Sequence, residues 1–202
     1  MSHSTCTCVR LTAVLAVTCA MFTLVAAQDM DYVRALERAQ KERPSTIASV
    51  ARIAPEGEPG TPLVLRGRLF AADGQTPVPD AIVFAYHTDR TGLYNLPGVQ
   101  GHSWRLRGWA KTDREGRFEF DTIRPGVYPS RNVPAHVHFA LYMTGAQYFG
   151  GEIQFEDDSL IRPEDRERSR AAGAFGQVRP VRTNGQRQEV DFELRIDPKQ
   201  KF

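Results

Sequence analysis

The pattern of apolar and polar positions changes its period once along the chain. Residues 29–43 place Tyr32, Val33, Leu36 and Ala39 on one face of a helix, and Pro44 follows, so the pattern predicts one amphipathic helix. Residues 44–62 contain the sequence EGEPGTP and are expected to form a linker. From residue 63 onward, short β-rich runs alternate with turn sequences such as ADGQ and DREG. This second pattern is typical of strands joined by hairpins.

Seven strands are expected after the linker, at residues 63–71, 81–87, 109–112, 117–121, 135–142, 152–155 and 189–196. No helical period separates them, which favours an antiparallel β-sandwich. Residues 162–187 are rich in Arg, Gly and Pro with little periodicity, and we expect a long surface segment there. The predicted fold class is therefore all-β, with a sandwich domain over residues 63–202 and a short N-terminal helix.

The first 27 residues have the pattern of a secretory signal peptide. Arg10 precedes an apolar run over residues 11–27, and that run ends in Val25-Ala26-Ala27 before Gln28. We expect cleavage before Gln28, export to a periplasm or to the medium, and no stable membrane association afterwards. The alternative is an uncleaved N-terminal anchor, because 17 apolar residues are at the short end of what spans a bilayer.

Charge and cysteine content exclude several classes of function. The 202 residues include 26 Lys and Arg against 24 Asp and Glu, and a net charge of +2 does not indicate a nucleic-acid partner. Cys6, Cys8 and Cys19 all precede the expected cleavage site, so a processed chain has no thiol chemistry and no cysteine-ligated zinc. Catalysis would then rest on histidines, tyrosines and carboxylates.

A histidine pair is the first candidate for that chemistry. His136 and His138 are two residues apart in a predicted strand, so both imidazoles point to one face while Val137 points to the other. Two imidazoles at this spacing suit a metal ion, although such pairs also occur on sheets without metal. The pair alone leaves both readings open.

Three ordered motifs resemble the intradiol ring-cleavage dioxygenases, which are non-haem iron(III) enzymes. The sequence Val78-Pro79-Asp80-Ala81 precedes a segment that ends in Gly92-Leu93-Tyr94. The block TDREGRFEFDTIRPGVYP follows and contains Tyr128, and PAHVHF contains both histidines. The resemblance covers about residues 63–160.

The resemblance implies four iron(III) ligands, namely Tyr94, Tyr128, His136 and His138. It also implies an aromatic substrate with two adjacent hydroxyl groups, cleaved between the hydroxylated carbons with O2. Phenolate oxygen is a hard anionic donor that suits a hard trivalent ion, and two neutral imidazoles add no charge. By position, Tyr128 is the axial ligand that the substrate displaces, and it would act as a base.

Two positions depart from the family pattern. Val133 stands where the family usually has an arginine, and Arg131 is the nearest guanidinium that could substitute for it. Glu152 stands where the family has a glutamine. We therefore expect an intact iron site and assign a catalytic role to Arg131 in addition to Tyr128.

The remaining aromatic residues and histidines are given structural roles. Tyr86, Trp104 and Trp109 are expected to pack in the core, and lining a pocket for an aromatic ring is the alternative. His87 and His102 are expected to be surface or turn histidines.

Two alternative functions remain open on the sequence. The TDREGRF block also resembles non-catalytic β-sandwich stalk modules, in which the tyrosine fills the core. A histidine-based zinc enzyme is the other alternative. The particular catechol and the oligomeric state, including a homo-oligomer, are not determined by the sequence.

Overall fold

The computed structural model describes residues 30–99 and 101–202, so the expected signal peptide lies outside the described part. Residues 30–41 form a helix, as the periodicity predicts, and it ends before Pro44. This helix belongs to one compact unit, and residues 43–202 form a second unit. In the described part of the chain, no helix combines the length and the apolar character needed to cross a membrane.

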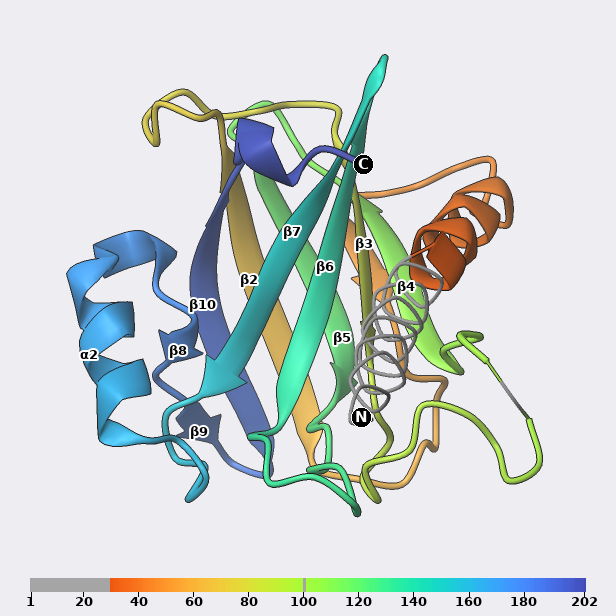
Figure 1. The fold of residues 1–202 in the computed structure, drawn as a ribbon, viewed down its shortest axis with the longest axis vertical. Coiled ribbons are helices and arrows are strands. Elements are labelled where there is room, and N and C mark those ends of the chain that lie inside the picture. The colour runs from red at the N-terminus through yellow and green to blue at the C-terminus, as the bar shows by residue number, and fades with distance from the viewer. Residues whose placement is uncertain (1–29, 100) are drawn as a thin grey trace, which may run out of the picture. The chain divides into compact units, whose positions relative to one another are not determined.

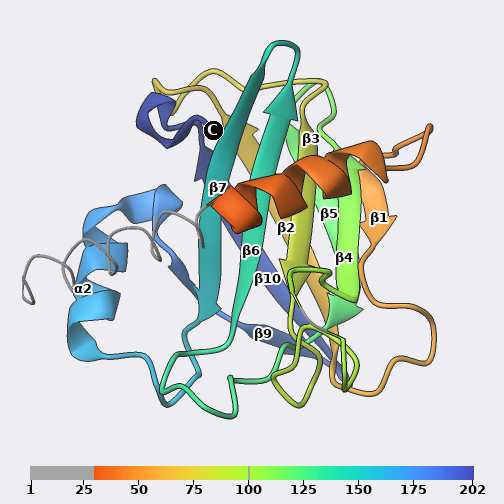
Figure 2. The ribbon, with the colours of Figure 1, turned by 45° about the vertical axis from the view of Figure 1, so that its right-hand side comes forward.

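Residues 43–202 form two five-stranded sheets that face each other (Figures 1 and 2). Sheet A has the order β1 (Val50–Arg52), β5 (Arg117–Ile123), β2 (Pro62–Phe70), β10 (Arg187–Arg195) and β9 (Arg182–Asn184). Sheet B has the order β4 (Leu106–Lys111), β3 (Ile82–His87), β6 (His136–Met143), β7 (Ala146–Phe155) and β8 (Val178–Arg179). The predicted β-sandwich is therefore confirmed.

The core lies between the sheets because each strand alternates its side chains. In β2, Leu65 and Leu69 are fully buried, whereas Arg66 between them is exposed. The inward residues of the two sheets meet in the middle, where the rings of Phe139 on β6 and Phe192 on β10 lie 5.1 Å apart. Burial of these apolar faces is the main force that holds the sheets together.

Strand pairing is mostly antiparallel, with parallel pairs among the described strands. β3 pairs antiparallel with β4 and β6, and β6 pairs antiparallel with β7. β10 pairs parallel with β2, β1 with β5, and β8 with β7. The parallel pair of β2 and β10 forms because the chain returns along sheet A only after the long segment that follows β7.

That long segment differs from the sequence prediction. It contains the helix α2 (Pro163–Ala171), the 3₁₀ turn η1 (Gly173–Phe175) and the short strands β8 and β9 (Figure 1). α2 starts with a proline, has Glu164 and Asp165 in its first turn, and has arginines in its last turn, which suits the helix dipole. Ser169 is its buried residue, so α2 has no apolar stripe that periodicity could detect.

Three other boundaries also differ. β1 forms within the expected linker, because Ile53 and Ala54 next to it are buried in the core. β4 begins three residues before the predicted start at residue 109, and β7 begins at Ala146 instead of residue 152. The chain ends in a second 3₁₀ turn, η2 (Pro198–Gln200).

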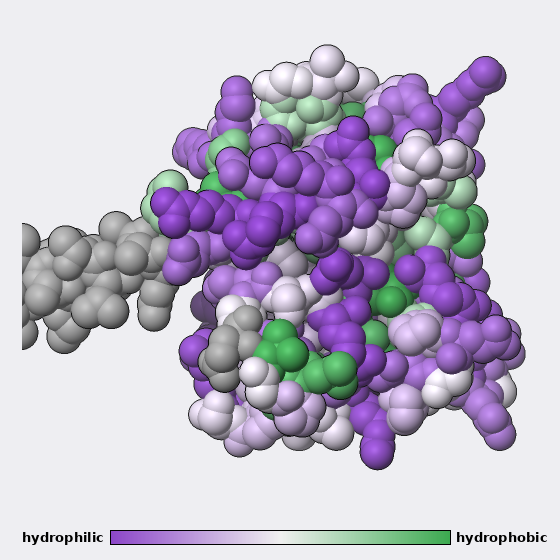
Figure 3. Space-filling view, turned by 90° about the vertical axis from the view of Figure 1, so that its right-hand side faces the viewer, coloured by the Kyte–Doolittle hydropathy of each residue, from purple (hydrophilic) through white to green (hydrophobic). Residues whose placement is uncertain are grey.

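The segments that join β3 to β4 and β5 to β6 lie at the same end of the sandwich (Figure 1). Leu93, Leu96 and Val99 on the first segment and Val127 on the second are exposed. Figure 3 shows one face of the protein, on which hydrophobic side chains form small separate areas among hydrophilic ones. The two segments carry Tyr94 and Tyr128, so this end of the sandwich positions the candidate site.

Candidate metal centre

The histidine pair lies at the start of β6. His136 and His138 are the first and third residues of the strand, and their Nε2 atoms are 2.9 Å apart. Val137 between them is fully buried in the core, as alternation in a strand requires. The prediction that both imidazoles share one face is confirmed.

The backbone fixes the tautomer of His136. Its Nδ1 is 2.7 Å from the carbonyl oxygen of Pro134, which can only accept a hydrogen bond. Nδ1 therefore carries the proton and donates it, and Nε2 of the neutral ring keeps a free lone pair. This arrangement is typical of a histidine that presents Nε2 to a metal.

The two tyrosines reach the histidines from different segments. The hydroxyl oxygens of Tyr94 and Tyr128 are 2.6 Å apart. The Tyr128 oxygen is 2.9 Å from Nε2 of His136 and donates to its lone pair. The four residues that the resemblance indicates thus form a row of contacts, from Tyr94 to Tyr128, from Tyr128 to His136 and from His136 to His138. We call them the four-residue cluster.

Two glycines allow the tyrosine-bearing segments to approach closely. Gly92 has φ 84°, and a Cβ atom there would lie 1.9 Å from the carbonyl oxygen of Val127. A Cβ at Gly126 would lie 2.5 Å from the carbonyl oxygen of Arg90. Because neither glycine has a Cβ atom, the segments can approach, and the Gly126 N–H donates to the Asp89 carbonyl at 2.8 Å, which ties the two segments together. Any larger side chain at Gly92 or Gly126 would separate Tyr94 from Tyr128.

An ion pair holds the other side of the Tyr94 segment. Arg105 donates its backbone N–H to the Tyr94 carbonyl at 2.8 Å. Its guanidinium donates to both carboxylate oxygens of Glu58, each at 2.7 Å. The Arg105 guanidinium holds the pKa of Glu58 below its usual value. This two-point contact fixes the segment more firmly than a single hydrogen bond would.

Burial keeps the cluster neutral in the protein alone. Burial raises the pKa of Tyr128, while the hydrogen bond from Tyr94 lowers it; the carboxylate of Glu152 raises it and Arg131 lowers it. Burial also lowers the pKa of His138 to about 3, and His136 acts in the same direction. Ionisation of Tyr128 therefore needs a compensating positive charge, which a bound cation would supply.

Arg131 is placed at the edge of the site. Its side chain is exposed and, within residues 30–99 and 101–202, forms no hydrogen bond or ion pair with the cluster, whereas its backbone N–H donates to the Tyr128 carbonyl at 3.4 Å. Its charge reaches Tyr128, because it lowers the pKa of that residue. The catalytic role of Arg131 stays a prediction.

The other two histidines of the described residues lie outside the cluster, and the expectation for His87 was wrong. His87 is fully buried, with Nδ1 2.6 Å from the Thr88 carbonyl and Nε2 2.7 Å from Thr122 Oγ1. It is a core histidine because both ring nitrogens find partners there. His102 is exposed, as expected for a turn histidine.

Two aromatic residues assigned to core packing also lie against the site. Tyr86 on β3 is the cross-strand partner of His138, and the two rings stack at 5.0 Å. Trp104 stacks on Tyr86 at 4.1 Å and has a positive φ of 41°, a strained value for a large residue. The stack restricts the orientation of the His138 ring. Only the register between β3 and β6 shows this contact, so no local motif could have indicated it.

Glu152 adds a carboxylate beside the histidines. Ligand atoms of His136, His138 and Glu152 lie within 4.8 Å of one another. Oε2 of Glu152 is 3.6 Å from Nδ1 of His138, which is the ring nitrogen that faces away from His136. Glu152 therefore lies behind the His138 ring.

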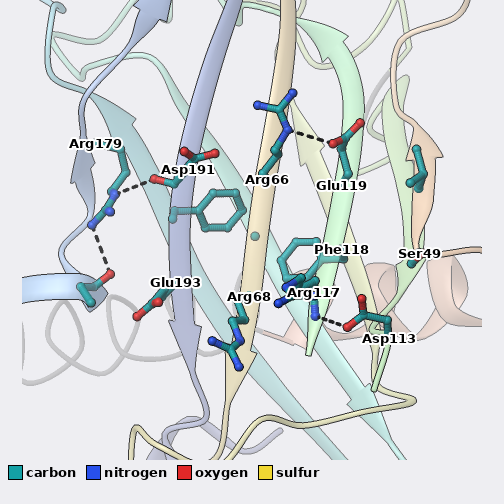
Figure 4. Close-up of a pocket in the computed structure, with 14 residues that line it drawn as sticks. Ser49, Arg66, Arg68, Asp113, Arg117, Phe118, Glu119, Arg179, Asp191 and Glu193 are labelled. Atoms are coloured by element: carbon teal, nitrogen blue, oxygen red, sulfur yellow. Dashed lines mark hydrogen bonds and ion pairs between the residues drawn. The ribbon is translucent and has the colours of Figure 1, made fainter. Parts of the chain in front are cut away.

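A separate cavity of about 480 Å³ lies on the outer side of sheet A (Figure 4). Arg66 and Arg68 on β2 lie between Glu119 on β5 and the acidic residues Asp191 and Glu193 on β10. Arg66 is paired with Glu119 and Glu189, so its charge is already compensated. The cavity contains none of the cluster residues, and we do not assign the chemistry to it.

The donor set of the cluster fits a trivalent iron. It offers two phenol oxygens that become hard anionic donors on ionisation and two imidazole lone pairs. Zinc sites in proteins instead use cysteine, histidine and carboxylate ligands. The lone pair on Nε2 of His136 and the adjacent tyrosine oxygens are donor atoms that a cation needs.

The chain matches one family model and several curated relatives. Residues 39–198 match the family model described as "Dioxygenase". The chain is 29% identical over 127 residues to catechol 1,2-dioxygenase 2 of Acinetobacter lwoffii, covering 55% of this chain and 46% of the relative. It is 35% identical over 121 residues to the protocatechuate 3,4-dioxygenase beta chain of Burkholderia cepacia, covering 52% of this chain and 49% of the relative. The chain thus spans about half the length of the curated relatives that it matches.

Solved structures share the fold. An intradiol ring-cleavage dioxygenase from Tetranychus urticae superposes with a TM-score of 0.57 at 20% identity, over 77% of this chain and 89% of the other. The dioxygenase domain of a carbohydrate-binding fusion protein from Streptomyces sp. SirexAA-E gives 0.55 at 24% identity, over 72% and 86%. These likenesses show the fold, and the match over residues 39–198 together with the catechol and protocatechuate dioxygenase relatives shows that the chain belongs to the intradiol ring-cleavage dioxygenase family.

Proposed function

We propose that the protein binds one iron(III) through Tyr94, Tyr128, His136 and His138 and cleaves a catechol-type ring with O2. The observation that carries the proposal is the run of contacts of 2.6 to 2.9 Å between the two phenol oxygens and the two imidazole nitrogens. In the described part of the chain, this is the one place where tyrosine side chains from two loops meet a pair of histidines on a strand.

The iron supplies a Lewis acid that binds and activates the two adjacent oxygens of the substrate. The side chains of the protein would transfer the substrate proton and hold the donor atoms in place. Tyr128 Oη would accept a substrate proton, because burial raises its pKa above the usual value and so makes its phenolate a stronger base. His136 keeps its Nε2 lone pair directed at the site, and Tyr94 stays in place through its backbone contact with Arg105.

The class of substrate follows from the relatives. The names of the matching proteins refer to catechol, protocatechuate and 6-chlorohydroxyquinol. All three compounds are aromatic rings with two adjacent hydroxyl groups. We extend this shared class, an ortho-dihydroxy aromatic ring, to the present protein, with O2 as the second substrate.

Metal analysis and a visible spectrum of the purified protein test this proposal. We expect about one iron per chain and a broad visible band, since tyrosinate bound to iron(III) absorbs visible light. His136→Ala should lower the iron content sharply, whereas His102→Ala, which removes an exposed histidine outside the cluster, should not. Catechol-dependent oxygen uptake should follow the iron content. A colourless wild type that takes up no iron(III) would favour the stalk module, and one that binds zinc instead would favour the zinc enzyme.

We further propose that the protein is exported after cleavage before Gln28. The support is the sequence pattern of residues 1–27. N-terminal sequencing of protein collected outside the cytoplasm should begin at Gln28. A sequence that still contains Met1 or Arg10 would show instead that the segment is retained as an anchor.

A further inference from the structure

Exposed apolar side chains are concentrated beside the two tyrosines of the cluster. Six large hydrophobic side chains are exposed in the described part of the chain. Four of them lie on the two segments that carry the tyrosines, and we call these four the apolar rim: Leu93, Leu96, Val99 and Val127. Single exposed leucines or valines are common on protein surfaces, whereas a group of them beside a site indicates a surface that contacts an apolar ligand.

Leu93 and Val127 lie where the two segments meet. The backbone of Gly92 packs directly against the Val127 carbonyl. Thr88 Oγ1 donates to the Gly126 carbonyl at 2.8 Å and holds the segments in this contact. Leu93 and Val127 each precede a tyrosine of the cluster by one residue, so this part of the rim is continuous with the candidate site.

The other part of the rim belongs to a closed loop, residues 95–103. Asn95 Nδ2 donates to the Gly101 carbonyl at 2.7 Å, and Ser103 Oγ donates to Asn95 Oδ1 at 2.6 Å. These two bonds join the ends of the loop directly after Tyr94. The loop therefore keeps a fixed position next to the cluster.

A tight turn at the tip of this loop presents Leu96 and Val99. The Val99 N–H donates to the Leu96 carbonyl at 3.1 Å, with Pro97 and Gly98 between them. Gly98 has φ 84°, and proline followed by such a glycine is typical of a type II turn. The turn fixes both apolar residues in advance, which lowers the entropy cost of binding a ligand there.

The two segments also lack charge. Residues 91–104 and 125–130 contain no Asp, Glu, Lys or Arg, although these residues make up 25% of the chain. Arg90 and Arg131 are exposed at the ends of the segments. The rim thus offers apolar contact to a ligand, and an anionic ligand would find a positive charge only at its edge.

We propose that the apolar rim binds an alkyl or aryl substituent on the ring of the substrate; this rests on the function proposed above. A catechol whose two oxygens reach the cluster turns the opposite edge of its ring away from the cluster, and the rim is the surface next to the tyrosines. Each methylene group that leaves water contributes about fourfold to affinity. The protein should therefore prefer catechols with apolar substituents to catechol itself and to the carboxylated 3,4-dihydroxybenzoate.

Anaerobic titration of the iron-loaded full chain measures this preference through the visible band, without turnover. We expect 4-tert-butylcatechol to bind about 5- to 20-fold more tightly than catechol. The double variant Leu96→Ser with Val99→Ser should reduce this ratio to less than about threefold. Val50→Ser is the matched control, because Val50 lies on β1 outside the rim and is 59% exposed, as Leu96 is. Thermal unfolding checks that each variant keeps its fold, and Val127→Ser tests the other segment independently.

Methyl NMR of the metal-free chain detects the contact without iron. On addition of 4-tert-butylcatechol, the methyl signals of Leu96 and Val99 should shift, whereas those of Val50 should not. This measurement tests the rim whether or not the protein binds iron.

The outcomes separate the rim from the function. The same ratio in the wild type and the double variant would overturn the inference, as would tighter binding of 3,4-dihydroxybenzoate than of 4-tert-butylcatechol. A double variant that keeps the ratio but changes from dimer to monomer in sedimentation would assign the rim to a contact between two copies of the chain instead. A wild type that binds no iron would overturn the function, and the methyl shifts alone would then decide the role of the rim.

Discussion

Three of the four residues in the cluster are held by contacts that lie outside the cluster. Nδ1 of His136 donates to Pro134, His138 stacks on Tyr86, and the Tyr94 carbonyl accepts from Arg105. Such supporting contacts fix the direction of the donor atoms before a ligand arrives, which lowers the cost of ordering them. The effect of a substitution should therefore depend on whether the side chain supplies a donor or supports one.

Both tyrosines supply donor atoms, but substitutions of Tyr94 and Tyr128 should have different effects. If Tyr128 is the ligand that the substrate displaces, Tyr128→Phe should still hold iron through the other three residues. It should lose the base at Tyr128 Oη, and a general base contributes about 10²–10⁴-fold to a rate. Tyr94→Phe should instead hold iron weakly and show a shifted band, because Tyr94 stays bound throughout. Iron content, visible spectrum and oxygen uptake with catechol should be measured for both variants.

Tyr148 offers a matched control, since it lies on β7 outside the cluster. Tyr148→Phe should resemble the wild type in all three measurements. If Tyr94→Phe and Tyr128→Phe also keep wild-type iron, colour and oxygen uptake, neither tyrosine is a ligand. If the wild type and the variants bind iron but none of them consumes oxygen with catechol, the replacement of the family arginine by Val133 becomes the leading explanation.

Some contacts of single residues could be predicted from sequence and others could not. The shared face of His136 and His138 follows from the two-residue period of a strand, which needs no knowledge of the fold. The contact of Tyr86 with His138 depends on the register of β3 against β6. The place of Glu152 depends on a bulge, which adds one residue to β7 and was not visible in the sequence pattern.

At the scale of elements, the cluster depends on two loops that meet at glycines. Gly92→Ala would place a Cβ 1.9 Å from the Val127 carbonyl oxygen, so the segments carrying Tyr94 and Tyr128 must separate. We expect a loss of iron affinity of at least tenfold, because a cluster held by contacts under 3 Å tolerates little displacement. Iron titration and the visible band measure the effect.

Gly98→Ala is the control for that substitution. Gly98 lies in the same segment and has the same φ of 84°, but a Cβ there meets nothing within 4 Å. Both variants carry the backbone strain of alanine at positive φ, about 1 kcal/mol, and only Gly92→Ala carries the clash. Equal iron affinity in the two variants would show that the close approach of the loops does not matter for the metal.

Some helices and strands could be predicted from the sequence, and others could not. β2, β3, β5, β6 and β10 alternate apolar and polar residues or carry long apolar runs, and the sequence predicted them within two residues. α2 and β1 escaped prediction. α2 is polar all round, and β1 has three residues that gain their pairing only from β5. Their formation is decided by neighbours that are distant in the chain.

At the scale of the whole sandwich, a buried histidine joins the two sheets. His87 ends β3 in sheet B, and its Nε2 accepts from Oγ1 of Thr122 on β5 in sheet A at 2.7 Å. Its Nδ1 donates to the Thr88 carbonyl at 2.6 Å, so the ring is neutral and both nitrogens are satisfied. A proton on Nε2 would put a positive charge in the buried core and would require the hydrogen bond with Thr122 to reverse its direction.

Acid should therefore destabilise the protein through His87. Burial lowers the pKa of His87 from 6.5 to about 4, with Arg105 acting in the same direction and the Thr88 carbonyl, Glu58 and Asp89 opposing it. Between these two values the unfolded chain binds a proton that the folded chain does not, so the free energy of unfolding falls as the pH falls from 6.5 toward 4. Above pH 6.5 the stability that depends on a neutral His87 is fully present. From pH 7 to pH 4.5 the loss should be about 2 kcal/mol.

Chemical denaturation of the wild type, His87→Gln and His102→Gln at pH 7 and pH 4.5 tests this. His87→Gln should be less stable than the wild type at pH 7, because its amide fits the two bonds less well, but should lose about 2 kcal/mol less on acidification. His102→Gln should follow the wild type, since His102 is exposed. His138, whose pKa burial also lowers, is present in all three proteins and cancels in the comparison. If His87→Gln and the wild type lose the same free energy between the two pH values, His87 is not the group that makes the sandwich sensitive to acid.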